Sequence, residues 1–232
     1  MIKKMRKTII PILSSIVLIL ISACSDMNEL HDKYLMDGET IYIAKFDSMY
    51  LYPGRERAMM MYWLSDPKAK KCVIKWALGN DSIIKDIHVT PLDQPGYLFI
   101  ENLNEGSVSF DIINRDQNFK FASVKDSYTL TVYGDNFQAT LLNVSIKNLK
   151  YNASKSELGY TWSGDYDNTI GYQLKYTDKM GTSIDTLLSV ANRNIVLKQF
   201  PSGGSFEYRT LYLPEPAAID TFYTDYRSVK VP

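Results

Sequence analysis

Hydrophobic and polar residues alternate with a period of two along much of this chain. In residues 107–113, for example, Val108, Phe110 and Ile112 fall on one face, while serine and aspartate fall on the other. Residues 71–76 and 171–176 show the same pattern, and such alternation predicts strands with one buried face. Further strands are predicted at residues 40–44, 58–63, 83–89, 97–101, 128–133, 141–149, 159–162, 184–188, 194–198, 206–213 and 222–231. No segment of helical length after the N-terminal segment carries a 3.6-residue period, so an all-β fold is predicted.

Large aromatic residues recur at a spacing of about 100 residues. Trp63, Trp76 and Phe110 in the first half correspond to Trp162, Tyr176 and Tyr208 in the second, at offsets of 99, 100 and 98 residues. A repeat of this length, built from short strands, is the size of an immunoglobulin-like sandwich. We therefore predict two tandem β-sandwiches, at residues 39–133 and 134–232, which meet in the turn-forming residues 133–136.

The N-terminal segment has a different pattern, in which a basic stretch precedes an apolar run. Lys3, Lys4, Arg6 and Lys7 precede the apolar residues 9–21, and the run ends in Ile21-Ser22-Ala23-Cys24. A basic start, a short apolar run and small residues before a cut site mark an export signal rather than a membrane span. The cysteine completes a lipobox, so we predict a signal peptide at residues 1–23, a lipid on Cys24 and a tether at residues 24–38. An ordinary signal peptide with an incidental cysteine is the alternative.

Charges and cysteines narrow the function classes. The chain has 26 basic and 26 acidic side chains, and removal of the four basic residues of the signal leaves 22 against 26, a net charge of −4. This balance offers no basic surface for nucleic acid. Besides Cys24 the sequence has one cysteine, Cys72, so no intramolecular disulfide is predicted in the exported chain.

Few residues point to catalysis or to a cofactor. The two histidines are His31, in the predicted tether, and His88. Cys72 and His88 would act as nucleophile and base only if the fold brought them together. Cys72 shares a strand face with Ile74, which favours a buried and inert thiol. The sequence lacks the motifs of metalloproteases, serine hydrolases and phosphate-binding loops, so we predict no enzyme activity and no cofactor.

One acidic segment has the beginning of a calcium-binding loop. Asp165, Asp167 and Thr169 alternate oxygen-bearing side chains. The segment then departs from the calcium-binding pattern, because the glycine is Gly171 rather than residue 170 and Tyr176 replaces the bidentate glutamate. We therefore predict a polar hairpin loop here, and no metal site.

The aromatic residues divide into a predicted core and a candidate surface. Trp63, Trp76 and Trp162 fall on inward positions of predicted strands. Exposed rings stack against the C–H faces of sugars or against apolar partner surfaces. The candidate glycan or partner surface comprises Tyr97, Phe99, Tyr212, Tyr223 and Tyr226. Tyr97 and Phe99 lie on the strand face opposite to Ile100, and filling the junction between the sandwiches is the alternative role for the set.

Several positions resemble those of fibronectin type III modules. Trp63 stands where the strand-B tryptophan of these modules packs, and residues 103–106 stand where a turn precedes strand F. Ile74 and Trp76 correspond to the crossing strand C. The tyrosine expected early in strand F has no counterpart near Phe110. The resemblance implies immunoglobulin-like or fibronectin type III-like sandwiches, the first of them without a tyrosine corner.

Short segments with a further resemblance are spread over the mature chain. They are His31-Asp32-Lys33-Tyr34-Leu35, Gly38-Glu39, Ile41-Tyr42, Pro53-Gly54-Arg55-Glu56-Arg57, residues 100–106, Tyr133-Gly134, Tyr208-Arg209-Thr210, Leu213-Pro214-Glu215 and Ile219-Asp220-Thr221-Phe222. In these segments the sequence is similar to a family of uncharacterised lipoproteins of the Bacteroidetes, grouped as a domain of unknown function, DUF4998. The resemblance implies a cell-envelope lipoprotein that acts alongside glycan-uptake systems, and it brings no catalytic residues.

Two short patterns are similar to cell-envelope signals of that phylum. Asp26 and Glu29 follow the predicted anchor, as in an acidic export signal that sends lipoproteins to the outer leaflet facing the medium. This implies an outer-membrane protein that faces the cell surface. An aspartate, then serine or threonine, then an aliphatic residue is the O-glycosylation pattern of these bacteria, and it occurs at Ser48, Ser82 and Thr186.

These patterns together predict a non-enzymatic outer-membrane lipoprotein that presents a binding surface, accessory to extracellular glycan acquisition or adhesion. The alternative is a structural or docking subunit, or a spacer, of a cell-envelope protein complex. The expected partners are the membrane, through the lipid on Cys24, and a glycan or an envelope protein. A contiguous strip of exposed rings would favour a glycan, and a flat apolar patch would favour a protein.

Overall fold

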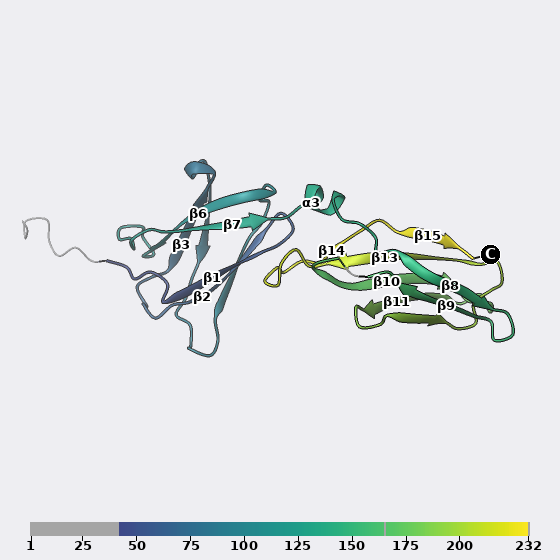
Figure 1. The fold of residues 1–232 in the computed structure, drawn as a ribbon. Helices are drawn as coiled ribbons and strands as arrows, with labels where there is room; N and C mark the ends of the chain where they lie inside the picture. Colours follow the sequence, from purple (N-terminus) through teal and green to yellow (C-terminus); the bar gives the residue numbers. More distant parts are fainter. Residues whose placement is uncertain (1–41, 165, 232) are drawn as a thin grey trace, which may run out of the picture. The chain divides into compact units, whose positions relative to one another are not determined.

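The computed structural model describes residues 42–164 and 166–231, which form antiparallel strands (Figure 1). The predicted signal peptide, Cys24 and the predicted tether lie outside these residues. The strands of the first half are β1 (Ser48–Pro53), β2 (Ala58–Trp63), β3 (Lys71–Trp76), β4 (Asp81–Asp86), β5 (Gly96–Ile100), β6 (Gly106–Arg115) and β7 (Asp126–Val132). Those of the second half are β8 (Ile146–Asn152), β9 (Glu157–Trp162), β10 (Thr169–Thr177), β11 (Ser183–Ser189), β12 (Asn194–Leu197), β13 (Ser205–Tyr212), β14 (Phe222–Tyr223) and β15 (Arg227–Lys230). A short helix, α3 (Asp135–Ala139), lies between β7 and β8.

Each half is a pair of sheets with the same strand order. The first half has the sheets β1-β2-β5 and β4-β3-β6-β7. The second half has the sheets β8-β9-β12 and β11-β10-β13, in which both β14 and β15 pair with β13. Chain crossings from β2 to β3 and from β9 to β10 lead from one sheet to the other, as in immunoglobulin-like sandwiches. The predicted all-β fold of two tandem sandwiches is confirmed, while the predicted domain limits, 39–133 and 134–232, stay a prediction.

A separate hydrophobic core fills each sandwich. The first core includes Met60, Tyr62, Cys72, Ile74, Ile100 and Phe110. The second is more aromatic and includes Tyr160, Trp162, Tyr172, Leu174, Phe206 and Tyr208. Trp162 stacks on Tyr172 with ring centroids 4.1 Å apart, which confirms its predicted place in a core. The burial of these large side chains is the main favourable contribution to folding.

Trp63 does not face the first core. Ala58, Met60 and Tyr62 are the buried residues of β2, so the alternation of the strand turns Trp63 outward, where it is half-buried. Tyr62 takes the inward place, and its ring lies so close to Gly96 that a Cβ there would overlap it. The expectation that Trp63 is a core residue is therefore wrong. An offset of 100 residues pairs Tyr62 with Trp162 and aligns the strand faces of the two sandwiches.

Three further elements differ from the sequence-based expectation. Residues 42–44, the described part of the predicted strand 40–44, belong to no strand, and the first strand is β1 instead. The predicted strand 222–231 is divided into β14 and β15 by residues 224–226. Helix α3 has only five residues, which is too short to carry a visible helical period.

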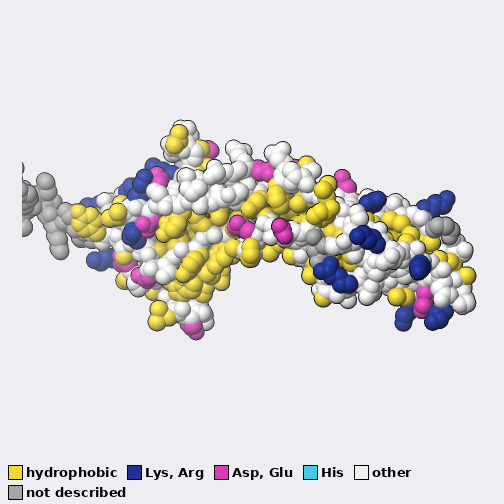
Figure 2. Space-filling view, viewed as in Figure 1, with side chains coloured by type: hydrophobic (Ala, Val, Ile, Leu, Met, Phe, Trp, Pro, Cys, Tyr) yellow, Lys and Arg dark blue, Asp and Glu magenta, His cyan; other side chains and the backbone are white. Residues whose placement is uncertain are grey.

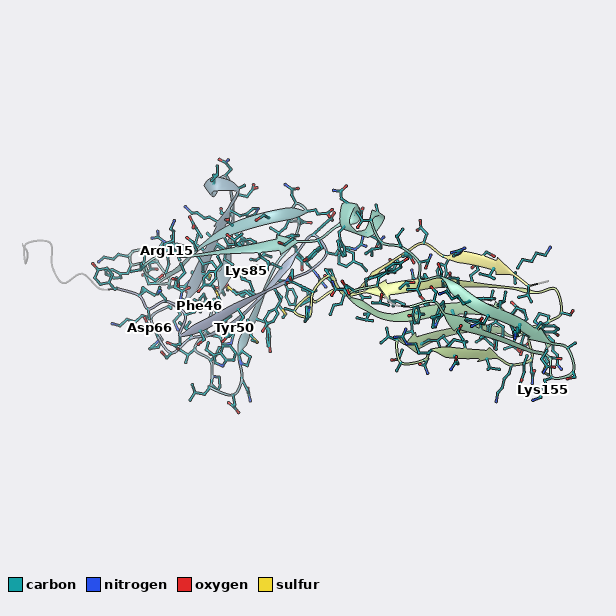
Figure 3. All side chains as sticks on the ribbon, viewed as in Figure 1. Phe46, Tyr50, Asp66, Lys85, Arg115 and Lys155 are labelled. Carbon is teal, nitrogen blue, oxygen red and sulfur yellow. The ribbon has the colours of Figure 1, made fainter. Side chains whose placement is uncertain are left out.

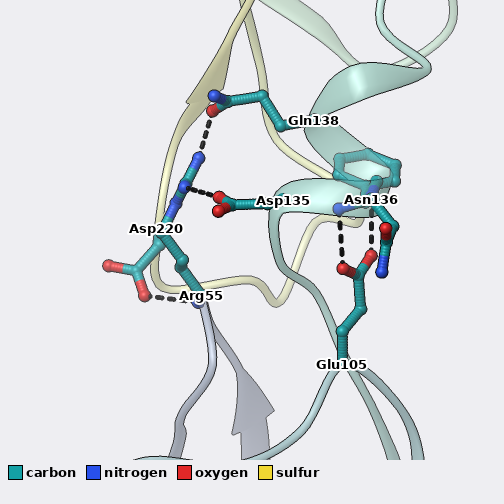
Figure 4. Close-up of polar contacts among 7 residues, drawn as sticks. Arg55, Glu105, Asp135, Asn136, Gln138 and Asp220 are labelled. Atoms are coloured by element: carbon teal, nitrogen blue, oxygen red, sulfur yellow. Dashed lines mark hydrogen bonds and ion pairs between the residues drawn. The ribbon is translucent and has the colours of Figure 1, made fainter.

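Helix α3 begins without a capping side chain of its own, because its N-cap residue is Gly134. The carboxylate of Glu105, from the loop before β6, accepts hydrogen bonds from the backbone N–H groups of Asn136 (2.8 Å) and Phe137 (2.6 Å), as Figure 4 shows. A Cβ at residue 134 would lie 2.8 Å from Glu105 Oε2, so glycine suits this close approach. A carboxylate at a helix N-terminus satisfies free N–H groups and favours the helix dipole.

Arg55 holds the same segment from the loop between β1 and β2. Its guanidinium donates to Asp135 Oδ1 (2.6 Å) and to the side-chain oxygen of Gln138 (Figure 4). Its backbone N–H donates to Asp220 Oδ2 (2.8 Å), and the guanidinium lies 4.7 Å from the ring centroid of Phe222. The loops next to α3 are therefore linked by charged side chains as well as by the chain itself.

Candidate functional site

The outer face of sheet β1-β2-β5 carries large apolar side chains. Residues directly opposite each other in antiparallel strands share a face. The register pairs Tyr50 with Met61 and Met61 with Tyr97 in one row across the sheet, and the neighbouring row is built in the same way. The whole surface, which we call the aromatic face, consists of Tyr50, Tyr52, Met59, Met61, Trp63, Tyr97 and Phe99.

The rings of the aromatic face are accessible to solvent. Tyr50 is 55% exposed, Tyr97 is 52% exposed and Phe99 is 40% exposed, while Met59 and Met61 between them are half-buried. Figure 2 shows hydrophobic side chains gathered over β1 and β2, and Figure 3 labels Tyr50 at β1. Contiguous apolar patches on protein surfaces mark interaction sites, so this face is the candidate site.

A groove lies at one end of the aromatic face, beside Trp63. The rings of Trp63 and Tyr50 meet almost at a right angle, with centroids 6.2 Å apart and an interplanar angle of 85°. The indole Nε1–H donates to the backbone oxygen of Leu92 (3.0 Å), which fixes the orientation of the ring. The groove has a volume of about 500 Å³ and is lined by Asp47, Ser48, Tyr50, Trp63, Ser65, Val89, Thr90 and Leu92.

Polar groups form the rim of this groove. Asp47 precedes β1, and its backbone N–H donates to the backbone oxygen of Trp63 (2.9 Å). Its carboxylate accepts a hydrogen bond from the Ser65 hydroxyl (3.0 Å). Thr90 accepts from the backbone N–H of Leu64 (2.9 Å), which ties the loop after β4 to the end of β2. The groove thus combines two ring walls with oxygen-bearing side chains held by the strands.

At the other end of the aromatic face, Phe99 lies beside Arg57. The guanidinium of Arg57 is 5.7 Å from the centroid of the Phe99 ring. It donates two hydrogen bonds to Asp220, through Nε (2.8 Å) and Nη2 (2.5 Å), and lies 3.8 Å from Glu101. The hydrogen bond from Arg57 is the main reason that the pKa of Asp220 lies below its ordinary value. The guanidinium is thereby largely neutralised by carboxylates of the protein.

The other predicted surface residues belong to the second sandwich. Tyr223, on β14, is 39% exposed, and the Arg209 guanidinium covers its ring at 3.9 Å from the centroid. Tyr226 is half-buried between Arg209 (4.8 Å) and Lys175 (4.5 Å). Tyr212 is only 4% exposed, and its hydroxyl donates to the backbone oxygen of Leu142 (2.6 Å). The expectation that Tyr212 is a surface residue is therefore wrong.

The predicted O-glycosylation positions differ in accessibility. Ser48 is exposed at the start of β1 and lines the groove. Ser82 is exposed on β4, and Thr186 is half-buried on β11. Their modification stays a prediction.

The two residues considered for catalysis lie in different environments. Cys72 is fully buried, and burial raises the pKa of its thiol to about 12, whereas His88 is exposed. Among residues 42–164 and 166–231, no group of three or more His, Cys, Asp or Glu side chains could hold a metal ion. Asp165, from the calcium-like segment, lies outside the described residues. No helix of the described part is long and apolar enough to cross a membrane.

Sequence reasoning missed five residues of the aromatic face, because it did not identify Tyr50, Tyr52, Met59 and Met61 and it assigned Trp63 to the core. A signal was present. Residues 49–52 and 58–63 are apolar at odd and even positions alike, and such runs are typical of strands that are covered on both faces. In the structure the outer face of this sheet is partly open to solvent, so the run could have identified an apolar surface.

The strand order of both halves defines a protein of two tandem fibronectin type III-like sandwiches. Over residues 24–222 the chain matches the family described as a domain of unknown function, DUF4998, and it belongs to that family. A comparison with curated proteins finds no match.

Two solved structures show what the chain is similar to. One is the crystal structure of the chicken CNTN1 FN1–FN3 domains, with 11% identity and a TM-score of 0.41 over 82% of this chain and 64% of that one. The chain therefore spans less than two thirds of that structure's length. The other is a segment of two fibronectin type III domains from chicken tenascin, with 9% identity and a TM-score of 0.31 over 81% of this chain and 99% of that one. The assignment of the fold rests on the strand order described above.

Proposed function

We propose that the protein is a non-enzymatic outer-membrane lipoprotein whose aromatic face binds a glycan, as an accessory to extracellular glycan acquisition or adhesion. The observation that carries the proposal is the run of open rings across β1-β2-β5, which spans three strands without a charged side chain among its members. Flat rings offer π faces to the C–H groups of sugars. The carboxylate and hydroxyl oxygens at the groove are acceptors for sugar hydroxyl groups.

A second function, docking to an envelope protein, is favoured by one observation. Met59 and Met61 occupy the middle strand of the face, between the rings of the two outer strands. Methionine adapts its shape to a partner and is enriched in protein interfaces. Glycan binding relies on the rings, whereas docking of a flat protein surface also relies on the two methionines of the middle strand.

The two functions can be separated by substitutions on the same sheet. Trp63→Ala and Tyr97→Ala each remove a stacking ring. The double variant Met59→Thr, Met61→Thr removes the two methionines of the middle strand but keeps every ring. Tyr166→Ala is the matched control, because Tyr166 is 47% exposed in the second sandwich. The full chain, purified in a detergent without a sugar headgroup, is applied to a glycan array and used to capture proteins from envelope extract.

We expect array binding that Trp63→Ala and Tyr97→Ala reduce by about tenfold or more, because aromatic anchors carry much of the affinity of a site. The double methionine variant and Tyr166→Ala should retain it. Silence on the array, together with one captured protein that is lost with the double methionine variant, would replace glycan binding by docking.

The location at the outer membrane is tested by a separate substitution. Cys24 is the predicted lipid acceptor, and it lies outside the described residues. Cys24→Ser should release the protein from membranes or leave the uncleaved precursor, because two acyl chains provide stable anchoring. Normal processing, membrane fractionation and incorporation of labelled palmitate in this variant would show that the anchor lies elsewhere.

A further inference from the structure

The groove beside Trp63 carries one charge. Of the residues that line it, only Asp47 is charged at neutral pH, and the others are aromatic, aliphatic or hydroxyl-bearing. Ser65 donates to Oδ1 of Asp47, and no other side chain among the described residues donates to this carboxylate, so Oδ2 can accept a further hydrogen bond. A negative charge therefore lies at the edge of the groove, and it repels anions.

Two cations near the aromatic face in the sequence, Arg57 and Lys45, are already paired. Arg57, at the Phe99 end, donates two hydrogen bonds to Asp220. Lys45, two residues before Asp47, forms an ion pair with Asp126 (2.7 Å). A sugar carboxylate or sulfate on this face would thus meet rings and the Asp47 carboxylate, and it would have to break an ion pair to bind Arg57 or Lys45.

We propose that the groove is a subsite for an uncharged pyranose ring of a neutral glycan, and that Asp47 is the specificity-determining residue that excludes uronate and sulfated sugars. This inference rests on the proposed glycan function. The sugar ring stacks on the fixed indole of Trp63 with its edge against Tyr50. A ring hydroxyl donates to the Asp47 carboxylate, and a hydrogen bond to a charged acceptor is stronger than one to a neutral acceptor. The same carboxylate rejects an acidic ring by repulsion, so one residue both binds and selects.

The second sandwich provides a contrast within the same chain. There Arg209 and Lys175 lie over the rings of Tyr223 and Tyr226, so exposed aromatic groups come with cations. If the chain bound acidic sugars, this region would suit them better than the groove does. The location of binding is therefore part of the test.

The experiment compares neutral and acidic oligosaccharides of equal length on the full chain by isothermal titration calorimetry. The neutral probes are gluco-, xylo-, manno- and galacto-oligosaccharides, and the acidic probes are oligogalacturonate and a sulfated oligosaccharide. The variants are Asp47→Asn, Asp47→Lys and Trp63→Ala, and Asp81→Asn is the matched control, since it removes an exposed carboxylate from the other sheet of the same sandwich. Circular dichroism verifies that each variant is folded.

We expect at least one neutral probe to bind about tenfold or more tightly than either acidic probe, because like-charge contacts are strongly unfavourable. Asp47→Asn should weaken the neutral probe by about fivefold to tenfold, because the amide oxygen still accepts the hydrogen bond but no longer carries a charge. Asp47→Lys should narrow or reverse the preference for the neutral probe, whereas Asp81→Asn should keep it.

Failure of this inference differs from failure of glycan binding itself. If acidic probes bind as well as neutral ones, and Trp63→Ala abolishes both, the aromatic face binds glycans and the role of Asp47 is wrong. The role of Asp47 is also wrong if Asp47→Lys leaves the preference unchanged. If acidic probes bind and only Arg209→Ala abolishes this, the site lies in the second sandwich. If no probe binds the parent chain, the proposed function itself is overturned.

Discussion

Sheet β1-β2-β5 of the first sandwich and sheet β8-β9-β12 of the second have the same strand order. They differ in the polarity of their outer faces, because the first is apolar and the second is mostly polar. Their inner faces are alike, since Met60 and Tyr62 correspond to Tyr160 and Trp162 at an offset of 100 residues. The outer face of the second sheet consists of Lys147, Lys150, Asn152, Glu157, Gly159, Thr161, Asn194 and Val196, of which only Val196 is a large apolar residue. The fold itself therefore does not require an apolar outer face, and the rings of the first sandwich need another reason.

The comparison is sharpest at the middle strand. Met59 and Met61 of β2 correspond to Gly159 and Thr161 of β9. Strand formation alone does not call for methionine at these half-buried positions, because threonine also fits the pleated surface and has the higher strand propensity. We infer that the outer face of the first sheet is suited to contact with a ligand or partner, and that the outer face of the second sheet is suited to contact with solvent.

The largest expected effect on stability distinguishes Trp162 from Trp63, which the sequence repeat aligns at an offset of 99 residues. Trp162→Ala should lower the free energy of unfolding by about 3–5 kcal/mol, because Trp162 is 6% exposed and its loss leaves a cavity among stacked rings. Trp63→Ala should lower it by only about 1–2 kcal/mol, since the side chain is half-buried on the outer face. Urea unfolding followed by far-UV circular dichroism measures both. Equal losses would place Trp63 in the core and remove it from the aromatic face.

A second pair of substitutions tests which face of β2 is inward. Met60→Thr should cost about 2–4 kcal/mol, because it opens a cavity and buries a hydroxyl group. Met61→Thr, which installs the residue found at the matching position of the second sandwich, should stay within about 1 kcal/mol of the parent. Denaturant midpoints of the two variants are the measurement. A larger cost for Met61→Thr than for Met60→Thr would mean that the strand faces are assigned the wrong way round.

A third pair concerns two glycines. Gly96→Ala should cost about 1–3 kcal/mol, since the added Cβ overlaps the buried Tyr62 ring of the first core. Gly159→Ala should be neutral within about 0.5 kcal/mol, because its Cβ would meet no atom closer than 3.9 Å. Thermal unfolding of both variants is sufficient to compare them. If Gly96→Ala were as harmless as Gly159→Ala, the tight packing of Tyr62 against β5 would be incorrect.

The smallest expected effect concerns Asp220. It forms an ion pair with Arg57, which lies beside Phe99 at one end of the aromatic face. The pKa of Asp220 is lowered in the folded chain, mainly by the hydrogen bond from Arg57. Its contribution to the free energy of unfolding is therefore present above the unfolded pKa of about 3.9, and it is lost as the pH falls through the lower, folded pKa. Asp220→Asn should cost about 1 kcal/mol at pH 7, given that both side chains are partly exposed. The difference from the parent should disappear in acid. Urea titrations at neutral and acidic pH measure it, and a cost independent of pH would show that the charge of Asp220 contributes nothing.

The elements that could be predicted from sequence are those in which one face is polar. In β6, Phe110 and Ile112 alternate with serine and aspartate, so both the strand and its buried face were visible. In β2, residues 58–63 are apolar throughout, so the strand could be predicted but the face on which Trp63 lies could not. A period-two pattern fixes a face only when the two faces differ in polarity.

The candidate site was predictable only in part. Tyr97 and Phe99 were identified as the strand face opposite Leu98 and Ile100, and the same alternation of rings with aliphatic side chains in residues 49–52 was missed. Their assembly into one surface depends on the pairing of β1, β2 and β5, which is set by contacts distant in sequence. Tyr212 was misplaced because tyrosine occurs both in cores and at surfaces, depending on where its hydroxyl finds a partner.

Transplanting one row of the second sheet onto the first tests the central claim most directly. Tyr50→Lys, Met61→Thr and Tyr97→Asn together copy the row Lys147, Thr161 and Asn194 onto the aromatic face. The measurement is the binding of the full-chain triple variant, relative to the parent, to the array glycans and envelope proteins that the parent binds. Our account predicts loss of that binding with an unchanged circular dichroism spectrum, because these residues serve contact rather than folding. Undiminished binding by the folded triple variant would show that recognition takes place elsewhere on the molecule.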